Sequence, residues 1–349
     1  MLSRMAESLY WIGRYVERAE DTARITEVTY NHTLEMGSTA EAEARSRRHW
    51  EALLAIVGDR PRFFEHQEVA DEDTVPPYLT FATDNPNSIV SCIAAARENA
   101  RTMRHQIASE MWEAINRFHL ELERIGSSGQ AARGADNAYL FYRSVMDFSH
   151  LFQGITDSTM PREEGWYFLQ TGKFLERAEK TARALDVKYH LLCPEEPHEA
   201  ASADDLARDS HQWISVLRSL SAYETYYRIS TSGVRPRSVV EMLILNPVVP
   251  RSIRFAVGKV ETALRHITED AASYNGTEQG TTQARAGEAR RAIGRLDAEL
   301  AYRRIAEIFD AGLHAYLIDV QRQCFEVGEH INEEFFAHRP LTAEEVVAG

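Results

Sequence analysis

The stretch GRYVERAEDTARITEV, residues 13–28, returns as GKFLERAEKTARALDV at residues 172–187. Nine of the sixteen positions are identical, including the glycine, the Glu-Arg pair and the glutamate and arginine that follow it. In the first copy the apolar side chains recur every three or four residues, which is the period of an amphipathic α-helix. The chain therefore carries one charged helix twice, 159 residues apart.

Most of the remaining sequence has the same helical period, and the clean alternation typical of strands is absent. Apolar stripes predict further helices over roughly 40–57, 87–124, 135–156, 162–192, 203–231, 235–245, 250–272 and 284–337. Breaks are predicted where turn-forming residues cluster, at 58–86, 125–135, 193–202 and 273–283. We therefore predict an all-α fold.

A second, weaker echo supports an internal duplication. Asn85-Pro86 recurs as Asn246-Pro247, 161 residues later, which is close to the offset of the charged helix. The sequence predicts a single large helical bundle-like domain over residues 1–349. This domain would be built from two pseudo-repeats, about 1–157 and 158–338.

Composition narrows the class of protein. The net charge of −14, from 39 basic and 53 acidic residues, argues against nucleic acid or an anionic membrane as the main partner. No window approaches the 18 apolar residues of a membrane span, and the N-terminus lacks the apolar core of a signal peptide. The three cysteines have neither a pairing nor a metal-type spacing, which is typical of buried thiols in a reducing compartment. We predict a soluble, cytoplasmic protein.

The candidate site is the pair of charged ridges that flank the apolar stripes of the repeated helix. Its members are Glu17, Arg18, Glu20 and Arg24 in the first copy and Glu176, Arg177, Glu179 and Arg183 in the second. Three hypotheses compete for them. In the first, the two helices cross-pair their charges in a partly buried network, and Gly13 and Gly172 permit the close approach.

In the second hypothesis, the four glutamates and the arginines line a cleft that binds a carboxylate- or ammonium-bearing ligand, because arginine forks bind carboxylates and glutamates accept ammonium protons. The third is a carboxylate metal site. Helical di-iron sites use Glu-x-x-His, whereas Glu20 and Glu179 stand where the histidines belong, and neighbouring arginines repel a cation. We therefore expect no metal site here.

Other chemistry is sparse. Arg251 and Arg254 lie in the predicted first turns of a helix, so they form a second candidate, an anion site at a helix N-terminus. The sequence has no phosphate-binding loop, dinucleotide fingerprint, His-Glu-x-x-His or Gly-x-Ser-x-Gly motif. It therefore points to no catalytic residue and to no cofactor, and the chain is expected not to be an enzyme by itself.

The opening LSRMAESLYWIGRYVERAEDTARI resembles the alpha-E family of all-helical bacterial proteins with a Glu-Arg motif. So do NPNSIVSCIAAARENAR (85–101), LFQGITDSTMPREEGWYFLQTGKFLERAEKTARALD (151–186), QWISVLRSLSAYETYYR (212–228) and VVEMLILNPVVPRSIRFAV (239–257). The resemblance covers essentially the whole chain. It maps the motif to Glu17-Arg18 and Glu176-Arg177.

The resemblance implies an operon shared with circularly permuted ATP-grasp ligases and transglutaminase-like proteins, and hence peptide or amide metabolism. The implied function is that of a non-catalytic accessory, scaffold or substrate-presenting partner of such a ligase. The alternative is a stand-alone enzyme or binding protein for an amino acid or small peptide that uses the paired ridges. A homo-oligomer remains open.

The eight charged residues of the two ridges are expected to differ in burial. We expect Glu17, Arg18, Glu176 and Arg177 to hold the fold. The other four charged residues are expected on the more accessible side, nearer to any ligand.

Overall fold

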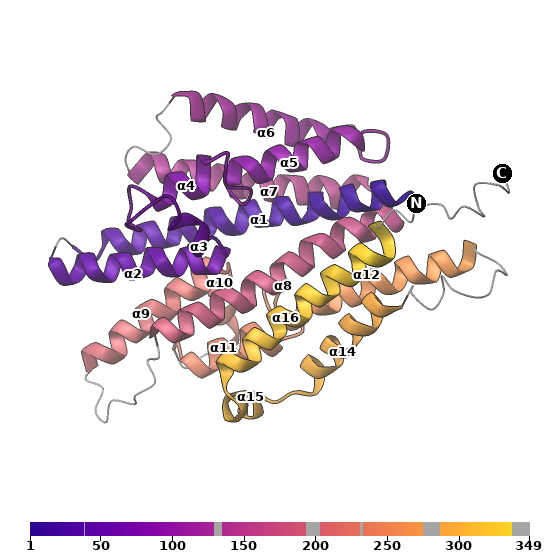
Figure 1. Ribbon diagram of the computed structural model, residues 1–349. Helices are drawn as coiled ribbons and strands as arrows, with labels where there is room; N and C mark the ends of the chain where they lie inside the picture. The colour runs from indigo at the N-terminus through magenta and orange to yellow at the C-terminus, as the bar shows by residue number, and fades with distance from the viewer. Residues whose placement is uncertain (38, 129–134, 193–202, 231–232, 275–286, 337–349) are drawn as a thin grey trace.

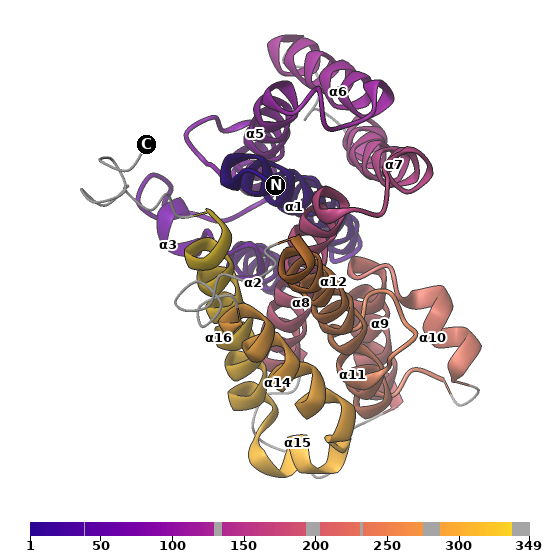
Figure 2. The ribbon, with the colours of Figure 1, turned by 90° about the vertical axis from the view of Figure 1, so that its right-hand side faces the viewer.

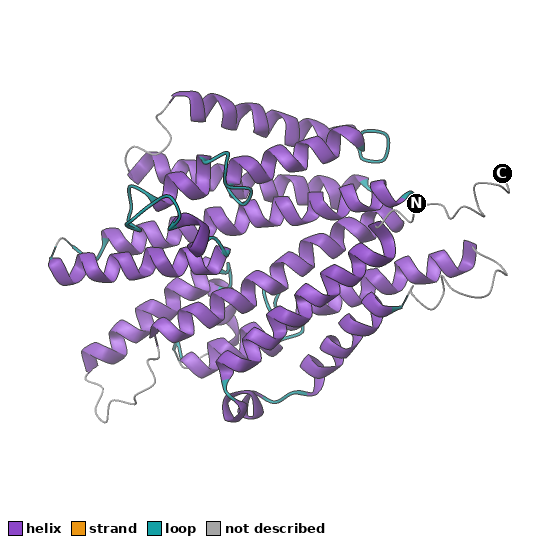
Figure 3. Cartoon of the chain, in the orientation of Figure 1, coloured by secondary structure: helices purple, strands orange, loops and turns teal. Residues whose placement is uncertain are grey.

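The computed structural model describes residues 1–37, 39–128, 135–192, 203–230, 233–274 and 287–336. Within these ranges every regular element is a helix, as predicted (Figure 3). In chain order they are α1 (Ser3–Leu34), α2 (Ala40–Val57), α3 (Arg60–Phe63), α4 (Val75–Phe81), α5 (Ile89–Thr102), α6 (Ser109–Ser128), α7 (Ala135–Thr159), α8 (Glu164–Leu192), α9 (Ala203–Ser219), α10 (Tyr223–Ile229), α11 (Pro236–Leu245), α12 (Ile253–Tyr274), α14 (Glu288–Tyr302), α15 (Ile305–Ala311), α16 (Leu313–Ile331) and η1 (Asn332–Phe336), a π-helix.

The two copies of the charged helix, α1 and α8, lie at the centre of the molecule and pack against each other (Figures 1 and 2). Helices α4 to α7 cover α1 on one side, and α9 to α16 gather around α8 on the other. α1 packs on α5 and α7, and α8 packs on α12 and α16. The prediction that the two Glu-Arg helices are internal neighbours is confirmed.

The apolar side chains of both halves form one continuous cluster. Its largest buried members include Trp50, Phe63, Phe152, Phe168 and Trp213. The apolar stripe of α1 enters this cluster through Leu9, Ile12, Val16, Ala19 and Ala23, which are all buried. The division into two pseudo-repeats over the full length of the chain stays a prediction.

Four predicted segments are wrong. The run 87–124 is two helices, because the chain turns between the end of α5 at Thr102 and the start of α6 at Ser109. The segment 58–86 is not only a loop, since it contains α3 and α4, each with a proline in its first turn. The run 203–231 is broken between α9 and α10 at Ser221, which has a positive φ of 51°. The run 284–337 is several helices, because the chain turns between α14 and α15 and again at Gly312, whose φ is +96°. The breaks expected at 193–202 and 273–283 lie mostly outside the described residues.

Two further expectations concern burial and membranes. Cys92 and Cys324 are buried thiols, and Cys193 lies outside the described residues. Among the helices described, none combines the length and the apolar character that crossing a bilayer requires.

Candidate functional site

The centre of the molecule is a glycine-to-backbone contact between α1 and α8. A Cβ atom on Gly13 would lie 2.2 Å from the carbonyl oxygen of Leu169, and one on Gly172 would lie 2.0 Å from that of Tyr10. Both distances are far below van der Waals contact, and the obstacle is backbone in each case. Leu169 and Tyr10 occupy matching positions of the two copies, so the contact is reciprocal. The predicted role of the two glycines in close approach is confirmed.

The Glu-Arg pairs meet just beyond this contact. Arg177 of α8 holds Glu17 of α1 through two hydrogen bonds, Nε to Oε1 at 2.6 Å and Nη2 to Oε2 at 2.8 Å. Arg18 holds Glu176 in the same way, at 2.8 and 2.9 Å. Such forks fix two carboxylates in both distance and orientation. Each helix therefore supplies the glutamate for one fork and the arginine for the other.

Arg251, which lies just before α12, joins the Glu17 side of this network. Its guanidinium donates to Glu17 at 3.0 Å and to Asp21 at 2.8 Å, and it also donates to Glu20. The anion site expected at Arg251 is therefore corrected, because three carboxylates of α1 already occupy this guanidinium. Arg254 donates to the backbone oxygen of Leu245, and its binding of an anion stays a prediction.

Glu20 is held from three directions. Besides Arg251, it accepts a hydrogen bond from Arg24 Nη2 at 2.6 Å and one from Ser149 Oγ on α7 at 2.9 Å. Burial opposes its charge, but Arg251 and then His150 and Arg24 hold the pKa of Glu20 well below its usual value. Glu20 is therefore a fixed anion at neutral pH.

Asp21 shows the opposite balance. Burial raises its pKa to about 7, and the nearby charge of Glu17 adds to the effect, although Arg251 opposes it. In this cluster three acidic side chains of α1, Glu17, Glu20 and Asp21, form ion pairs with three guanidiniums. These belong to Arg24, Arg177 and Arg251.

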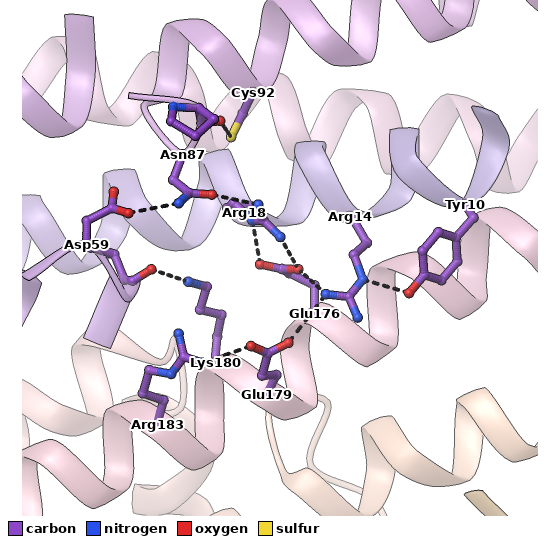
Figure 4. A network of polar contacts seen from close by, with 12 residues as sticks. Tyr10, Arg14, Arg18, Asp59, Asn87, Cys92, Glu176, Glu179, Lys180 and Arg183 are labelled. Atoms are coloured by element: carbon purple, nitrogen blue, oxygen red, sulfur yellow. Dashed lines mark hydrogen bonds and ion pairs between the residues drawn. The ribbon is translucent and has the colours of Figure 1, made fainter. Parts of the chain in front are cut away.

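The opposite side of the α1–α8 pair carries the matching cluster, drawn in Figure 4. Arg14 donates to Glu176 at 3.0 Å, to Glu179 at 3.3 Å and to the hydroxyl of Tyr10 at 2.9 Å. Arg183 donates to the other oxygen of Glu179 at 2.9 Å. Burial raises the pKa of a carboxylate, but Arg18 and Arg14 lower that of Glu176 strongly.

Side chains from the N-terminal half complete this second cluster. Arg18 donates to Asn87 at 2.7 Å, and Asn87 in turn donates to Asp59 at 2.8 Å (Figure 4). Lys180 donates to the backbone oxygen of Val57 at 3.1 Å. The charged network therefore ties the loops before α3 and α5 to the centre of the fold.

The second sequence echo forms the same turn at both of its copies. The N–H of Asn87 donates to Asn85 Oδ1, and the N–H of Val248 donates to Asn246 Oδ1, both at 2.9 Å. One turn precedes α5 and supplies Asn87 to the network, and the other precedes α12 and leads to Arg251. The weak Asn-Pro echo thus marks the two loops that contact the Glu-Arg helices.

All eight predicted charged residues lie in this network, but their expected division is partly wrong. Glu17 and Glu176 are buried, at 0% and 1% exposure. Glu20 is equally buried, at 1%, because Arg251 and Ser149 cover it. Arg24, Glu179 and Arg183 are partly exposed as expected, but Arg18, expected among the buried four, is also partly exposed, at 16% against 12% for Arg24.

Several members of the network were missed from sequence. Arg14 could have been included, because the second copy also has a basic residue, Lys173, at the matching position. The repeat gave no reason to include Asp21, because the matching residue of the second copy is Lys180, which has the opposite charge. The partnership of Arg251 with α1 joins residues more than 200 positions apart, and no spacing within one helix could have indicated it.

Two pockets flank the network, one at each cluster. The first, of about 320 Å³, is lined by Glu20, Lys173, Arg177 and Arg251, together with His150, Gln153, Ser221, Thr225, Val249 and Pro250. We call it the Lys173 pocket. The second, of about 360 Å³, is lined in part by Arg14 and Glu179, which are the counterparts of Lys173 and Glu20 in the repeated helix. Volumes of this size suit small-molecule ligands.

Lys173 distinguishes the first pocket. Its side chain is 8% exposed, and within the described residues its ammonium has no hydrogen-bond or ion-pair partner. Burial, and then the charge of Arg177, lower the pKa of Lys173 to about 8. In the same pocket the buried amide of Gln153 has no partner for its oxygen or its nitrogen. Arg14, the counterpart of Lys173, is bound by two carboxylates instead.

The model of a family named Alpha-E, described as a predicted alpha-helical domain with a conserved ER motif, matches residues 1–336. An uncharacterised protein of Mycobacterium bovis and one of Mycobacterium tuberculosis are each 23% identical over 335 residues. In both cases the match covers 91% of this chain but 36% of the relative. No solved structure matches the chain.

Proposed function

We propose that this chain, which belongs to the Alpha-E family, is an accessory protein of an ATP-grasp amide or peptide ligase and presents a carboxylate-bearing substrate in the Lys173 pocket. The observation that carries this proposal is the buried ammonium of Lys173, which lies 5.0 Å from the ring centroid of Phe174 but has no hydrogen-bond or ion-pair partner among the described residues. The unpaired amide of Gln153 lines the same pocket. The charges of Glu17 and Asp157 favour this ammonium but do not offset its burial, and a buried cation without a hydrogen-bonded counter-charge is unfavourable for folding. A ligand carboxylate would supply both the missing charge and a hydrogen-bond acceptor for the amide.

The glutamates and arginines of the repeated helix serve a different role in this proposal. Their charges are matched by one another and by Arg251, so they hold the wall of the pocket rather than the ligand. Arg177 and Arg251 line the pocket, but their hydrogen-bonding edges already bind carboxylates of α1. Lys173 is therefore the cation of this pocket whose hydrogen-bond donors are not already taken by a carboxylate of the described residues.

The partnership with a ligase draws support from the relatives. Nearly two thirds of each mycobacterial relative lies outside the match, so there the matched region is covalently joined to further sequence. Regions joined in one chain commonly work together, so the matched region in these relatives is expected to act with the sequence joined to it. The partner proposed from the family resemblance is the circularly permuted ATP-grasp ligase, with a transglutaminase-like protein as a second member of the system.

Lys173→Met is the variant that tests the ligand site. It should abolish the binding of small peptides or amino acids whose carboxylate wild-type protein binds, as measured by calorimetry. It should also raise the free energy of unfolding at pH 7 by about 1–3 kcal/mol, because the lowered lysine pKa corresponds to that order of burial penalty. A variant that is more stable yet inactive is typical of a residue kept for function.

The sign of the pH dependence follows from the same pKa. Lys173 titrates near pH 8 in the folded protein and near its ordinary value of 10.5 in the unfolded chain. Between these values the unfolded chain holds the extra proton, so this residue makes wild-type stability rise with pH. Below pH 8 its full penalty is present, and the gain from Lys173→Met should be greatest there.

Lys188→Met is the matched control. Lys188 lies on the same helix, is also buried, and has its pKa lowered to about 8 by burial, but it does not line the Lys173 pocket. It should gain stability and keep ligand binding. Equal ligand affinity in wild type and Lys173→Met would overturn the proposed site.

The accessory role is tested separately with the ligase. Co-purification at a fixed stoichiometry, and ligation that requires the added chain, are the expected results. The competing function is a stand-alone enzyme or binding protein for an amino acid or small peptide. Turnover of a small peptide by the purified chain, with no ligase present, would favour that function and refute the accessory role.

A further inference from the structure

A cluster of three potential metal ligands lies where the C-terminal part of α8 meets the beginning of α16. Asp186 and His190 are one turn apart on α8, and His314 is in the first turn of α16. Asp186 Oδ1 lies 2.7 Å from His314 Nδ1 and 3.5 Å from His190 Nε2. All three ligand atoms lie within 4.8 Å of one another, and no other group of three or more such residues is found in the described part of the chain.

We propose that Asp186, His190 and His314 form a binding site for a divalent transition-metal ion such as Zn²⁺. Ligands about 2.1 Å from an ion lie roughly 3.0–3.5 Å from one another in tetrahedral or octahedral geometry. The 3.5 Å distance from Asp186 to His190 already lies in this range, whereas the 2.7 Å distance to His314 has to lengthen by a few tenths of an ångström. The two imidazole nitrogens lie within 4.8 Å of each other, so small ring rotations suffice to bring them to the same range. Both histidines are exposed, at 43% and 55%, and their rings can turn without disturbing the core.

The donor set determines which ions fit. Two imidazole nitrogens and one carboxylate oxygen suit Zn²⁺ and its neighbours in the first transition row. Calcium and magnesium prefer sites made wholly of oxygen. Three protein ligands with exposed rings leave positions for water or for another ligand, so the site is of the open kind.

The local fold supports a cation at this place. Asp186 is nearly buried and brings a negative charge to the base of the cluster, while the two exposed histidines close it from the solvent side. His190 lies in the last turn of α8, where the helix dipole favours positive charge. The first turn of α16 disfavours a cation, because a helix N-terminus carries a partial positive charge. That partial charge is smaller than the full negative charge of the Asp186 carboxylate.

An ion here would tie α8 to α16. The carboxylate and one imidazole come from the helix at the centre of the fold, and the other imidazole comes from α16, which packs along that helix. Without an ion, Asp186 makes a hydrogen bond with His314 and a longer contact, of 3.5 Å, with His190. Metal binding to the folded state would stabilise it in proportion to the logarithm of the free ion concentration.

The test uses the full chain without any histidine tag. Co²⁺ should produce visible absorption bands that saturate at one ion per chain, and Zn²⁺ should displace it and raise the melting temperature. His190→Ala and His314→Ala should each weaken Co²⁺ and Zn²⁺ binding at least tenfold, since even outer-shell partners are worth about 10–100-fold. Ca²⁺ and Mg²⁺ at the same concentrations should shift neither signal.

His330→Ala is the control, because His330 is also on α16 and has an acidic neighbour, Glu333, at 3.8 Å. It should bind Co²⁺ as wild type does. The proposal is overturned if wild type gives no saturable bands, or if His190→Ala and His314→Ala bind Co²⁺ as tightly as wild type. Both histidines are exposed, so these variants should remain folded, and far-UV circular dichroism checks that they do.

Discussion

Gly172→Ala is expected to lower the free energy of unfolding by about 3 kcal/mol or more, at the upper end of the penalties for overpacking. The new methyl group would lie 2.0 Å from the carbonyl oxygen of Tyr10. A backbone atom cannot rotate away as a side chain can, so α1 and α8 must separate. That separation would also stretch the forks between Glu17 and Arg177 and between Arg18 and Glu176. Denaturant unfolding followed by circular dichroism measures the loss.

Gly154→Ala is the matched control for this substitution. Gly154 is also inside a long helix, α7, but a Cβ there meets nothing within 4 Å. Alanine should be neutral or should stabilise by about 0.5–1 kcal/mol, because it favours the helix more than glycine does. If both variants have the stability of wild type, the close approach of α1 and α8 does not contribute as described.

Glu17→Gln is expected to lower the free energy of unfolding by about 3–5 kcal/mol. Glu17 is completely buried and accepts hydrogen bonds from both Arg177 and Arg251. The neutral amide keeps the shape of the side chain but removes the charge, so two buried guanidiniums lose part of their compensation. Thermal and denaturant unfolding should both report the loss.

An exposed pair provides the comparison for Glu17. Glu299 is held by Arg303 at 2.8 Å on the surface of α14. Glu299→Gln should change stability by less than about 1 kcal/mol, because water screens and replaces such pairs. A loss of similar size in both variants would show that burial is not what makes the charge of Glu17 important.

The repeated motif allowed the centre of the fold to be predicted from sequence. Two copies of one helix, each with a glycine and a Glu-Arg pair in the same register, indicated that the helices face each other. The structure confirms this in the contacts of Gly13 and Gly172 and in the two reciprocal forks. The prediction succeeded because both residues of each of these contacts belong to the repeated segment, so the sequence shows both partners.

Features without a counterpart in the repeat could not be predicted in the same way. Arg251 reaches Glu17, Glu20 and Asp21 from a distant loop, and this reverses its expected role as an anion ligand. The burial of Glu20 depends on that same loop. Helical period also could not show the break at Ser221, where backbone conformation rather than apolar spacing ends the helix.

The Lys173 pocket depends on a difference between the two copies. Arg14 and Lys173 occupy matching positions and are both basic, so the sequence alone predicts the same role for both. In the structure Arg14 finds two carboxylates and Lys173 finds none among the described residues. The equivalent carboxylates exist in both copies, Glu176 and Glu179 beside Arg14 and Glu17 and Glu20 in the first copy, but Glu17 and Glu20 are bound by Arg251, which lies outside the repeat.

The central claim is that the Glu-Arg motif holds α1 and α8 together, and a double-mutant cycle on Glu17 and Arg177 tests it most directly. The free energy of unfolding is measured for wild type, Glu17→Gln, Arg177→Met and the double variant. Arg251 keeps Glu20 and Asp21 in all four proteins, so the cycle reports mainly the fork itself. A coupling energy of about 1.5 kcal/mol or more is expected, as for other close charge pairs. Additive effects, within about 0.5 kcal/mol, would contradict the account.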